Sequence, residues 1–178
     1  MDVYPPAEDT FLLLKFLESI KSATYSCEIG SGSGVITEKL LNISERALAT
    51  DIDFKACEAT WKRTKKSYKL DVICCDSLTS IREIEMFDLI VSNPPYLPYE
   101  GEHSSWSGGK GGIEVPLKFV KDGLRRLKKG GKIAMVLSSL SSIEELVSAL
   151  PSDVKVERPI KAKLGLFEEL YIIEISRK

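Results

Sequence analysis

The chain has 178 residues, of which 43% are hydrophobic and 29% are charged, and its formal net charge at pH 7 is -1. This length supports one well-packed domain and is too short for two domains of ordinary size. No apolar run reaches the roughly 18 residues of a membrane span, and residues 1–6 lack the basic stretch of a signal peptide, so we expect a cytoplasmic protein without a membrane segment. The near-zero net charge supplies no overall field that would attract nucleic acid.

The first expected helix follows Pro5 and Pro6, which suit the first turn of a helix. Its broad apolar surface consists of Phe11, Leu12, Leu14, Phe16, Leu17 and Ile20. We therefore expect residues 1–22 to form an N-terminal helical segment.

After this segment the chain alternates between strand-like and helix-like runs. Strands are expected at residues 26–29, 47–50, 72–75, 87–92, 132–137, 155–159 and 169–175. Helices are expected at residues 35–41, 54–66, 114–127 and 142–150. Gly130 and Gly131 are expected to end the helix at 114–127, because glycine adopts the left-handed backbone that often follows a helix. The pattern predicts an α/β fold with a seven-stranded Rossmann-like sheet, mostly parallel with a C-terminal antiparallel hairpin, and helices on both faces.

The basic run and the cysteines predict no site of their own. We interpret the basic run as the solvated face of a helix rather than a phosphate site; it comprises Lys62, Arg63, Lys65, Lys66 and Lys69. The cysteines lack C-x-x-C spacing and have one histidine to join them, so we expect no metal site and interpret them as small buried residues in a reducing compartment. They are Cys27, Cys57, Cys74 and Cys75.

Three alternating glycines, Gly30, Gly32 and Gly34, follow the first expected strand, and the acid Glu28 lies just before them. Glycine lets the backbone turn tightly and approach a ligand closely. The spacing differs from the G-x-G-x-x-G loop that binds a dinucleotide pyrophosphate, and a carboxylate at this place would repel phosphate. The same carboxylate suits a cation, which favours the methionine part of S-adenosylmethionine as the ligand.

Polar residues also follow the second and third expected strands. Asp51 comes about twenty residues after the glycines, where a carboxylate can accept hydrogen bonds from ribose hydroxyls. Asp53 is interpreted as a helix N-cap. Asp76 and Ser77 follow the third strand, where a carboxylate can accept a bond from the adenine amino group. These residues predict one cofactor crevice at the ends of neighbouring strands.

Asn93, Pro94, Pro95 and Tyr96 follow the most apolar expected strand. The prolines remove backbone donors and stiffen the loop. The side-chain carbonyl of Asn93 and the main-chain carbonyl of Pro94 can therefore accept both hydrogens of an NH2 group, and the Tyr96 ring can stack on a planar amide or base. We refer to these four residues as the acceptor wall, and they predict methyl transfer to a planar nitrogen without a strong general base.

The acceptor wall leaves the substrate open. A glutamine amide and the N6 amino group of adenine in RNA or DNA fit it equally, although the near-neutral charge counts against nucleic acid. Transfer to lysine would first require loss of a proton from the ammonium group. A cofactor-binding scaffold without catalysis is the remaining alternative, and the intact wall counts against it.

With these motifs the chain resembles the HemK-type methyltransferases that modify the glutamine of the Gly-Gly-Gln motif in class I peptide release factors, and most closely their short eukaryotic and archaeal branch. The resemblance includes the segments at 3–11 and 106–112 and spans nearly the whole chain. It implies a single S-adenosylmethionine-dependent methyltransferase domain over residues 1–178, with residues 1–22 on the cofactor and substrate side. It also implies that the chain methylates the N5 nitrogen of glutamine.

The resemblance assigns roles to individual residues. The cofactor-binding residues it implies are Thr10, Glu28, Gly30, Gly32, Gly34, Asp51, Ile52, Asp76, Ser77 and Asn93. The catalytic residues are Asn93, Pro94 and Tyr96, and the substrate-binding residues are Asn93, Pro94, Pro95, Tyr96 and Trp106. Trp106 could equally anchor local packing.

Substrate recognition is expected to involve more than the acceptor wall. Bacterial members of the family carry a separate N-terminal recognition domain, which we do not expect in this protein, so recognition is expected from the opening segment, the loop at 99–112 or a partner. This loop suits a mobile lid. We interpret His103 within it as solvated rather than as a base. The short branch commonly works with a small zinc-binding activator protein, which implies a heterodimer, with the strand at 72–75 offering the sheet edge.

Overall fold

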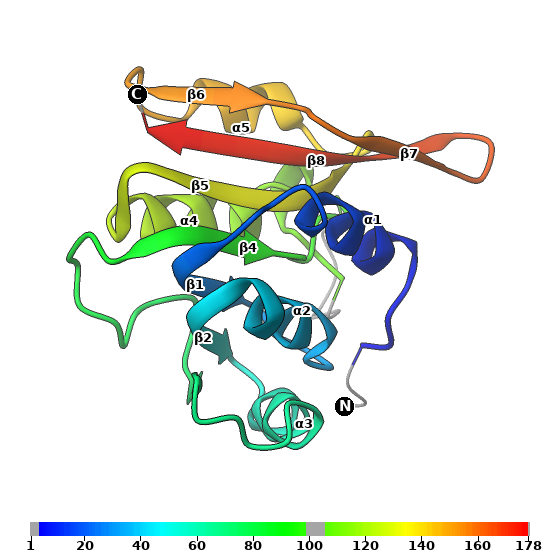
Figure 1. Cartoon of the computed structure of the whole chain (residues 1–178). Helices are drawn as coiled ribbons and strands as arrows, with labels where there is room; N and C mark the ends of the chain where they lie inside the picture. Colours follow the sequence, from blue (N-terminus) through cyan, green and yellow to red (C-terminus); the bar gives the residue numbers. More distant parts are fainter. Residues whose placement is uncertain (1–3, 99–105, 178) are drawn as a thin grey trace.

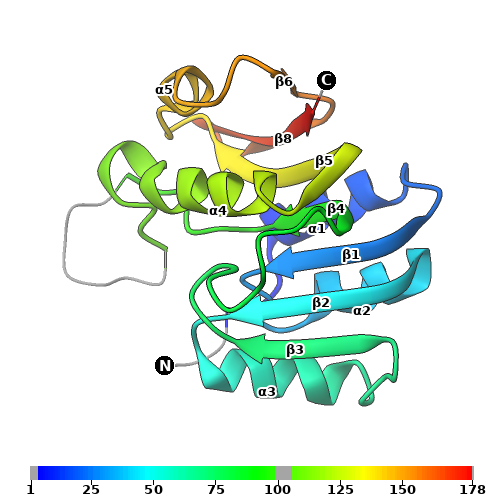
Figure 2. The same cartoon turned by 90° about the vertical axis from the view of Figure 1, so that its left-hand side faces the viewer.

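The computed structural model describes residues 4–98 and 106–177, and eight strands within these residues form one sheet (Figures 1 and 2). The strands are β1 (Ala23–Ile29), β2 (Ser44–Asp51), β3 (Leu70–Cys74), β4 (Phe87–Ser92), β5 (Leu127–Ser138), β6 (Val154–Glu157), β7 (Lys161–Leu164) and β8 (Glu168–Arg177). Their order is β3-β2-β1-β4-β5-β8-β6, with β7 also paired to β8. Strands β1 to β5 are parallel, whereas β8 is antiparallel to β5, β6 and β7. The predicted fold class is confirmed.

Helices cover both faces of this sheet. Those in the described ranges are α1 (Glu8–Leu17), α2 (Val35–Ile43), α3 (Phe54–Arg63), α4 (Glu114–Leu124), α5 (Ile143–Ser148) and the short 3-10 helix η1 (Lys110–Gly112). One hydrophobic cluster joins α1 and α2 to the sheet, and a second joins α4 and α5 to it. Helix α3 packs beside β2 and β3, at the bottom of Figure 1. No helix within residues 4–98 and 106–177 combines the length and hydropathy that a membrane span requires.

Strand β4 lies in the middle of the sheet because its sequence is apolar on both faces. Leu89 and Val91 belong to the cluster with α1 and α2, whereas Ile90 belongs to the cluster with α4. Successive side chains of a strand point to opposite faces, so a strand covered on both sides needs a nearly unbroken apolar run. The predicted bounds of 87–92 are those of β4.

Helix α1 packs against β8, so the first helix of the fold meets its last strand. Leu13 and Phe16 of α1 are buried in one cluster with Leu170 and Ile172 of β8. This packing holds α1 beside the end of the sheet from which the 92–98 segment leaves, as Figure 1 shows.

The sheet contains β7 in addition to the seven strands that the sequence predicts. In β7 the cations Lys161 and Lys163 alternate with Ala162 and Leu164, so its apolar pattern is short and weak. The strand pairs with β8 alone, through a hairpin that turns at Gly165, where φ is +67°. Its formation therefore depends on backbone pairing with β8 more than on burial.

Gly130 and Gly131 lie in β5, so the expectation that they end the preceding helix is wrong. Helix α4 ends at Leu124. Strand β5 pairs with β4 first through Leu127 and Phe87 and next through Lys132 and Leu89, so residue 88 stands opposite residues 128–131. Gly130, with φ of +74°, allows the backbone excursion. The two glycines therefore belong to an irregularity in the pairing of β4 and β5 and do not cap a helix.

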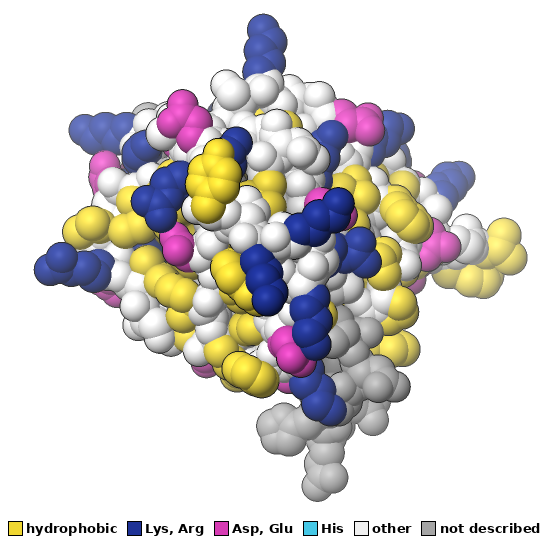
Figure 3. All heavy atoms as spheres, turned by 60° about the horizontal axis from the view of Figure 1, so that its bottom comes forward, with side chains coloured by type: hydrophobic (Ala, Val, Ile, Leu, Met, Phe, Trp, Pro, Cys, Tyr) yellow, Lys and Arg dark blue, Asp and Glu magenta, His cyan; other side chains and the backbone are white. Residues whose placement is uncertain are grey.

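Helix α3 begins as predicted and ends earlier. Asp53 is its N-cap and accepts a hydrogen bond from the Lys55 amide at 2.9 Å, as expected. The helix ends at Arg63 rather than residue 66, because Lys65 and Lys66 have φ angles of +52° and +56°. The basic run is largely exposed, and on this face lysine and arginine side chains are spread among hydrophobic ones (Figure 3).

The expectation that all four cysteines are buried is wrong for Cys74. Cys27 and Cys57 are buried, whereas Cys74 is exposed and Cys75 is half-buried. Cys74 ends β3, an edge strand, and an edge strand has no neighbour to cover its outer side. Cys75 lies just beyond the strand that was predicted to contain it.

Candidate cofactor and acceptor site

The residues predicted for the cofactor, apart from Thr10 in α1, lie at or after the carboxyl ends of β1, β2, β3 and β4, which are neighbours in the sheet. Ile29 pairs with Thr50, and Asp51 pairs with Cys74, so the three loops that follow these strands begin side by side. Crevices at the carboxyl ends of parallel strands are the usual ligand sites of open α/β sheets.

The glycine loop adopts a backbone that requires glycine. Gly30, Gly32 and Gly34 have φ angles of +77°, +50° and +77°. The Gly30 amide donates to the Thr50 carbonyl at 2.8 Å, which fixes the loop against β2. A Cβ atom on Gly34 would lie 2.7 Å from the Thr60 Cα atom, so this glycine also lets α3 approach. The loop presents backbone rather than side chains to the crevice.

Asp51 is held by two backbone amides. Its Oδ2 accepts from the Gly32 amide at 2.8 Å, and its Oδ1 accepts from the Asp53 amide at 2.9 Å. Burial raises the pKa of Asp51, and the amide bonds act in the opposite direction. Each oxygen keeps a second lone pair, so the oriented carboxylate can still accept bonds from a diol. Ile52, directly after it, is 73% exposed and available to cover a flat ring.

Glu28 is a buried carboxyl group just before the glycine loop. It is 2% exposed, and the Thr37 hydroxyl donates a hydrogen bond to its Oε2. Burial is the main cause that raises the pKa of Glu28 to about 8. A nearby cation would stabilise the charged form and lower this pKa. The site therefore fits the positively charged methionine part of S-adenosylmethionine.

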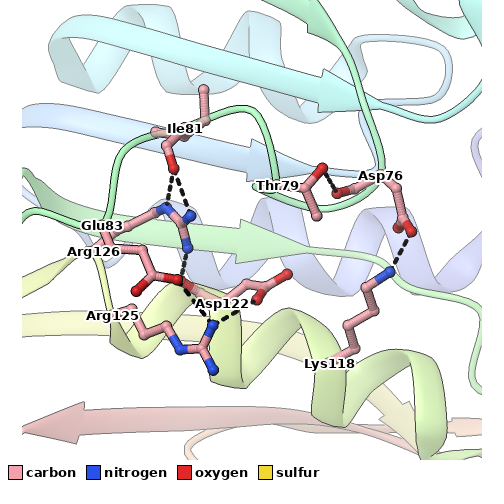
Figure 4. A network of polar contacts seen from close by, with 8 residues as sticks. All are labelled: Asp76, Thr79, Ile81, Glu83, Lys118, Asp122, Arg125 and Arg126. Carbon is pink, nitrogen blue, oxygen red and sulfur yellow. Dashed lines mark hydrogen bonds and ion pairs between the residues drawn. The ribbon is translucent and has the colours of Figure 1, made fainter.

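Asp76 and Ser77 follow β3, and the Asp76 side chain points toward α4 (Figure 4). The Asp76 carboxylate forms an ion pair with Lys118 of α4. Ser77 has φ of +55°, and its buried Oγ has no hydrogen-bond partner among the described residues. Asp76 therefore offers a charged hydrogen-bond acceptor to a nucleobase, and Ser77 offers a neutral one.

Arg126 fixes the segment that carries Asp76. The guanidinium is 3% exposed and donates twice to the Ile81 carbonyl, at 3.1 and 2.5 Å, and once to the Asp122 carbonyl at 2.8 Å (Figure 4). These bonds connect the loop after β3 to α4. Arg126 was not among the predicted site residues, because an arginine that binds only backbone carbonyls leaves no pattern in the sequence.

The acceptor wall presents a buried oxygen without a partner. Asn93 Oδ1 has no hydrogen bond within the described part of the chain. The end of β4 below it is fixed, because the Ser92 hydroxyl donates to the Ile29 carbonyl at 2.7 Å. Thr50 Oγ1, which was not predicted as a site atom, is likewise buried and without a partner in these residues. Buried polar atoms are nearly always hydrogen-bonded, so unsatisfied oxygens at the ends of β2, β3 and β4 fit a polar ligand in the crevice.

Tyr96 is anchored at both its backbone and its side chain. The Ser141 hydroxyl donates to the Tyr96 carbonyl at 2.7 Å, and the Tyr96 hydroxyl donates to Asp9 Oδ2 at 3.3 Å. The ring packs against both hydrophobic clusters. Burial is the largest cause that raises the pKa of Tyr96 well above its usual value, so the hydroxyl stays protonated.

Asp9 connects the opening helix to the acceptor wall, a role that sequence reasoning missed. It is 4% exposed and accepts from Tyr4 at 3.1 Å, from the Thr10 amide at 2.6 Å and from the Thr10 hydroxyl at 3.2 Å, besides Tyr96. Burial, followed by the charge of Asp9, raises the pKa of Tyr4 to about 12. A signal was present, because an acid at a position destined for burial needs several donors. Thr10, which was predicted to contact the cofactor, belongs to this group of hydrogen bonds around Asp9.

The segment at 106–112 packs directly on the acceptor wall. The Leu97 amide donates to the Trp106 carbonyl at 3.2 Å, and the Gly108 amide donates to the Leu97 carbonyl at 3.0 Å. A Cβ atom on Gly112 would collide with the Tyr96 carbonyl. The Trp106 ring is 58% exposed and meets the Tyr4 ring edge-on, with centroids 6.5 Å apart. His103 and residues 99–105 as a whole lie outside the described residues.

Comparisons with known proteins match this chain to methyltransferases. The family model for the methyltransferase small domain matches residues 8–159. A relative from Methanocaldococcus jannaschii, named "Putative protein N5-glutamine methyltransferase", is 32% identical over 185 residues that cover 99% of this chain and 92% of the relative. The eRF1 methyltransferase catalytic subunit mtq2 of Schizosaccharomyces pombe is 29% identical over 99% of this chain and 90% of its own length.

A solved structure extends the likeness to three dimensions. The structure is that of the E. cuniculi Mtq2-Trm112 complex, described as responsible for methylation of the eRF1 translation termination factor. The matched chain shares 27% identity with this one, the alignment covers 100% of both chains, and the TM-score is 0.80.

Proposed function

This chain belongs to the methyltransferase small domain family, and within it to the HemK-type S-adenosylmethionine-dependent methyltransferases, and from that membership we propose that it methylates the glutamine side-chain amide in the Gly-Gly-Gln motif of a class I peptide release factor. The relatives that match along nearly their whole length are named for N5-glutamine or eRF1 methylation, which supports this substrate over adenine or lysine.

The observation that carries the proposal is the buried Asn93 Oδ1, which has no hydrogen-bond partner among the described residues. An amide NH2 donates one hydrogen to Asn93 Oδ1 and the other to the Pro94 carbonyl, which satisfies the buried oxygen and fixes the nitrogen in the plane of both acceptors. Acceptors on both hydrogens increase electron density on the nitrogen, so its lone pair is a better nucleophile. The proton that leaves becomes acidic once the nitrogen carries the new methyl group, so no strong base is required.

The cofactor site is proposed from the same strand ends. Glu28, Asp51, Asp76 and Ser77, with the glycine loop, would hold the methionine, ribose and adenine parts of S-adenosylmethionine, and Thr10 and Ile52 would flank it. The bound cofactor supplies an electrophilic methyl group. The chain's own contribution is to exclude water, orient the acceptor and stabilise the charge at its nitrogen. Tyr96 would flank the acceptor amide, with its ring fixed from behind by Asp9.

A small activator protein is proposed to cover the outer edge of β3. That strand ends the sheet on one side, and a groove of about 780 Å³ lies along it. The apolar side chains that line it include Tyr25, Phe54, Trp61, Ile73 and Met86. Unpaired strand edges bind partner strands, and the E. cuniculi relative was solved with Trm112. We further propose that the activator binds zinc and that the complex works in the cytoplasm.

The test uses the chain alone and with a candidate activator, labelled S-adenosylmethionine, and three substrates. These are a class I release factor, the same factor with its Gly-Gly-Gln glutamine replaced by arginine, and RNA. Label in the first factor but not in the second supports the proposal. Label in RNA alone shows an adenine methyltransferase, and equal label in both factors shows transfer to another side chain.

A further inference from the structure

The hairpin formed by β7 and β8 extends beyond the end of the sheet at which the candidate site lies (Figure 1). Strand β5 makes its last pair with β8 at Ser138 and Leu170, whereas β7 and β8 remain paired as far as Leu164 and Glu168. Three residues lie between these strands at the tip, and two of them, Leu166 and Phe167, are 91% and 92% exposed. We refer to Leu166 and Phe167 as the hairpin tip.

The base of this hairpin is bonded to the loop that holds the acceptor wall. The Ser138 hydroxyl donates to Glu168 Oε1 at 2.6 Å, and the Ser139 amide donates to the Glu169 carbonyl at 2.7 Å. Two residues further along, Ser141 donates to the Tyr96 carbonyl. The Glu168 carboxylate is near enough to contribute to the raised pKa of Tyr96. The hairpin tip therefore stands on a base that is directly connected to the acceptor wall.

Other exposed apolar side chains lie on the segments around this wall. Leu140, in the loop between Ser139 and Ser141, is 51% exposed, and Trp106 is 58% exposed. With the hairpin tip they supply large apolar groups from three separate segments, which are hydrogen-bonded to Tyr96, to Leu97 directly after it, or to the segment 138–141. Isolated apolar residues are common on protein surfaces, but a set that borders one site marks an interaction surface.

The charge around the hairpin tip favours a protein over a nucleic acid. Lys161 of β7 is paired with Glu169 at 3.2 Å, and Glu168 places another carboxylate at the base. Binding to a phosphate backbone depends on an excess of Lys and Arg, and Glu168 and Glu169 offset Lys161 and Lys163 here. A partner on β3 would leave this surface free, because β3 and β8 lie toward opposite sides of the sheet.

We propose that the hairpin tip, together with Leu140 and Trp106, is a docking surface for the folded protein that carries the acceptor glutamine. The substrate places its methylated loop against the acceptor wall, and an apolar surface beside that loop covers Leu166 and Phe167. This inference rests on the proposed function and adds to it a second contact, outside the site of transfer, that gives affinity for the whole protein substrate.

The experiment compares the wild-type chain with the Leu166→Ser/Phe167→Ser double variant, each in complex with its activator. Both side chains are almost fully exposed, so the variant keeps the fold. Two substrates are used, an intact class I release factor and a short peptide that contains Gly-Gly-Gln. The KM for the intact factor should rise about tenfold or more with kcat little changed, and the kinetic constants for the peptide should stay at wild-type values. Tyr68→Ser, at another residue that is 91% exposed, is the matched control and should alter neither substrate selectively.

The possible failures are distinct. If the wild-type complex does not methylate the release factor, the proposed function is wrong, and so is the occupant assigned to the hairpin tip. If the wild type methylates it and the double variant shows the same KM, or if both substrates lose activity equally, the docking surface alone is refuted. If sedimentation shows that the wild type pairs through this surface and the double variant does not, the hairpin tip joins two copies of the chain.

Discussion

The Tyr96 hydroxyl donates a hydrogen bond to Asp9 Oδ2 at 3.3 Å, across 87 positions of the sequence. This bond connects the opening helix to the acceptor wall, and Tyr4 adds a second phenol to the same carboxylate oxygen at 3.1 Å. Asp9 therefore positions a site residue without itself being placed to contact the acceptor nitrogen.

Tyr96→Phe tests whether this anchor matters for transfer. The change keeps the ring and removes the hydroxyl, so stability should fall by about 1 kcal/mol and kcat by several-fold. Asp9→Ala should cost more, because Asp9 also accepts from Tyr4 and Thr10, and the double variant should be little worse than Asp9→Ala alone, because the Tyr96 contact is already lost in that variant. Methyl-transfer kinetics and thermal unfolding measure the two quantities. Fully additive losses would show that Asp9 and Tyr96 act separately.

Asn93→Ala should abolish transfer and leave the cofactor bound. The substitution removes one of two acceptors of the amide hydrogens, which should lower kcat by about 100-fold or more. Titration calorimetry with S-adenosylhomocysteine should give a dissociation constant within a few-fold of the wild type. The control is Ser92→Ala, which removes the hydroxyl that fixes the end of β4 and should affect stability more than methyl transfer. Near-normal transfer by Asn93→Ala would contradict the proposed role of the wall.

The pKa of Glu28, raised to about 8, predicts a pH dependence of both stability and binding. Between pH 4.5 and 8 the unfolded chain has lost this proton and the folded chain retains it, so this residue lowers the stability of the ligand-free protein as pH rises through that range. Glu28→Gln should remove this slope. Thermal unfolding from pH 5 to 8 compares the two proteins.

Cofactor binding should release the same proton. A cationic ligand beside Glu28 favours the carboxylate, so affinity for S-adenosylmethionine should increase as pH rises toward 8. Calorimetry at pH 7 in buffers of different ionisation enthalpy should show proton release by the wild type and none by Glu28→Gln. Equal release by both proteins would assign the proton to another group.

Asp76 should matter for cofactor binding and Lys118 should not, although the two side chains form one ion pair. Asp76→Ala should weaken S-adenosylmethionine binding about tenfold, because a charged acceptor of the adenine amino group is lost. Lys118→Met should change stability by less than about 1 kcal/mol, because the two side chains are 43% and 48% exposed and solvent screens the pair. Calorimetry and thermal unfolding distinguish these effects, and equal loss of affinity in both variants would mean that the ion pair itself binds the cofactor.

Alanine substitutions at Gly34 and Gly130 should distinguish the cost of backbone strain from the cost of a steric clash, because the two glycines have nearly the same φ angle. Gly34 has φ of +77° and Gly130 has φ of +74°, but a new Cβ would lie 2.7 Å from Thr60 Cα at the first position and near no atom at the second. Gly130→Ala should cost about 1 kcal/mol, and Gly34→Ala should cost clearly more and displace α3. Equal changes in the free energy of unfolding would show that the loop moves freely away from α3.

The features that could be predicted from the sequence are those determined by neighbouring residues. The apolar run of β4, the three glycines and the Asp53 cap each follow from local chemistry, and the structure has all three. β7 was missed because its pairing with β8 outweighs its own composition, and Gly130 was misassigned because a bulge and a helix end make the same demand on the backbone.

The residues of the candidate site also differ in whether neighbouring residues in the sequence are enough to predict them. The strand-end residues could be found because each lies next to a recognisable strand in the sequence. The roles of Asp9 and Arg126 were missed, since their partners Tyr96 and Ile81 are distant in the chain and only the fold brings them together. Thr50 is distinguished only by the missing hydrogen bond of its buried hydroxyl, which the sequence does not show.

The packing of α1 against β8 has a consequence for synthesis at the ribosome. Leu13 and Phe16 are translated early, but the Leu170 and Ile172 side chains against which they pack emerge late. Until then α1 is not packed against β8, so Asp9 is not held in position to bond Tyr96. The acceptor wall of a nascent chain is therefore incomplete. The order of translation thus delays catalytic competence until the C-terminal strands have left the ribosome.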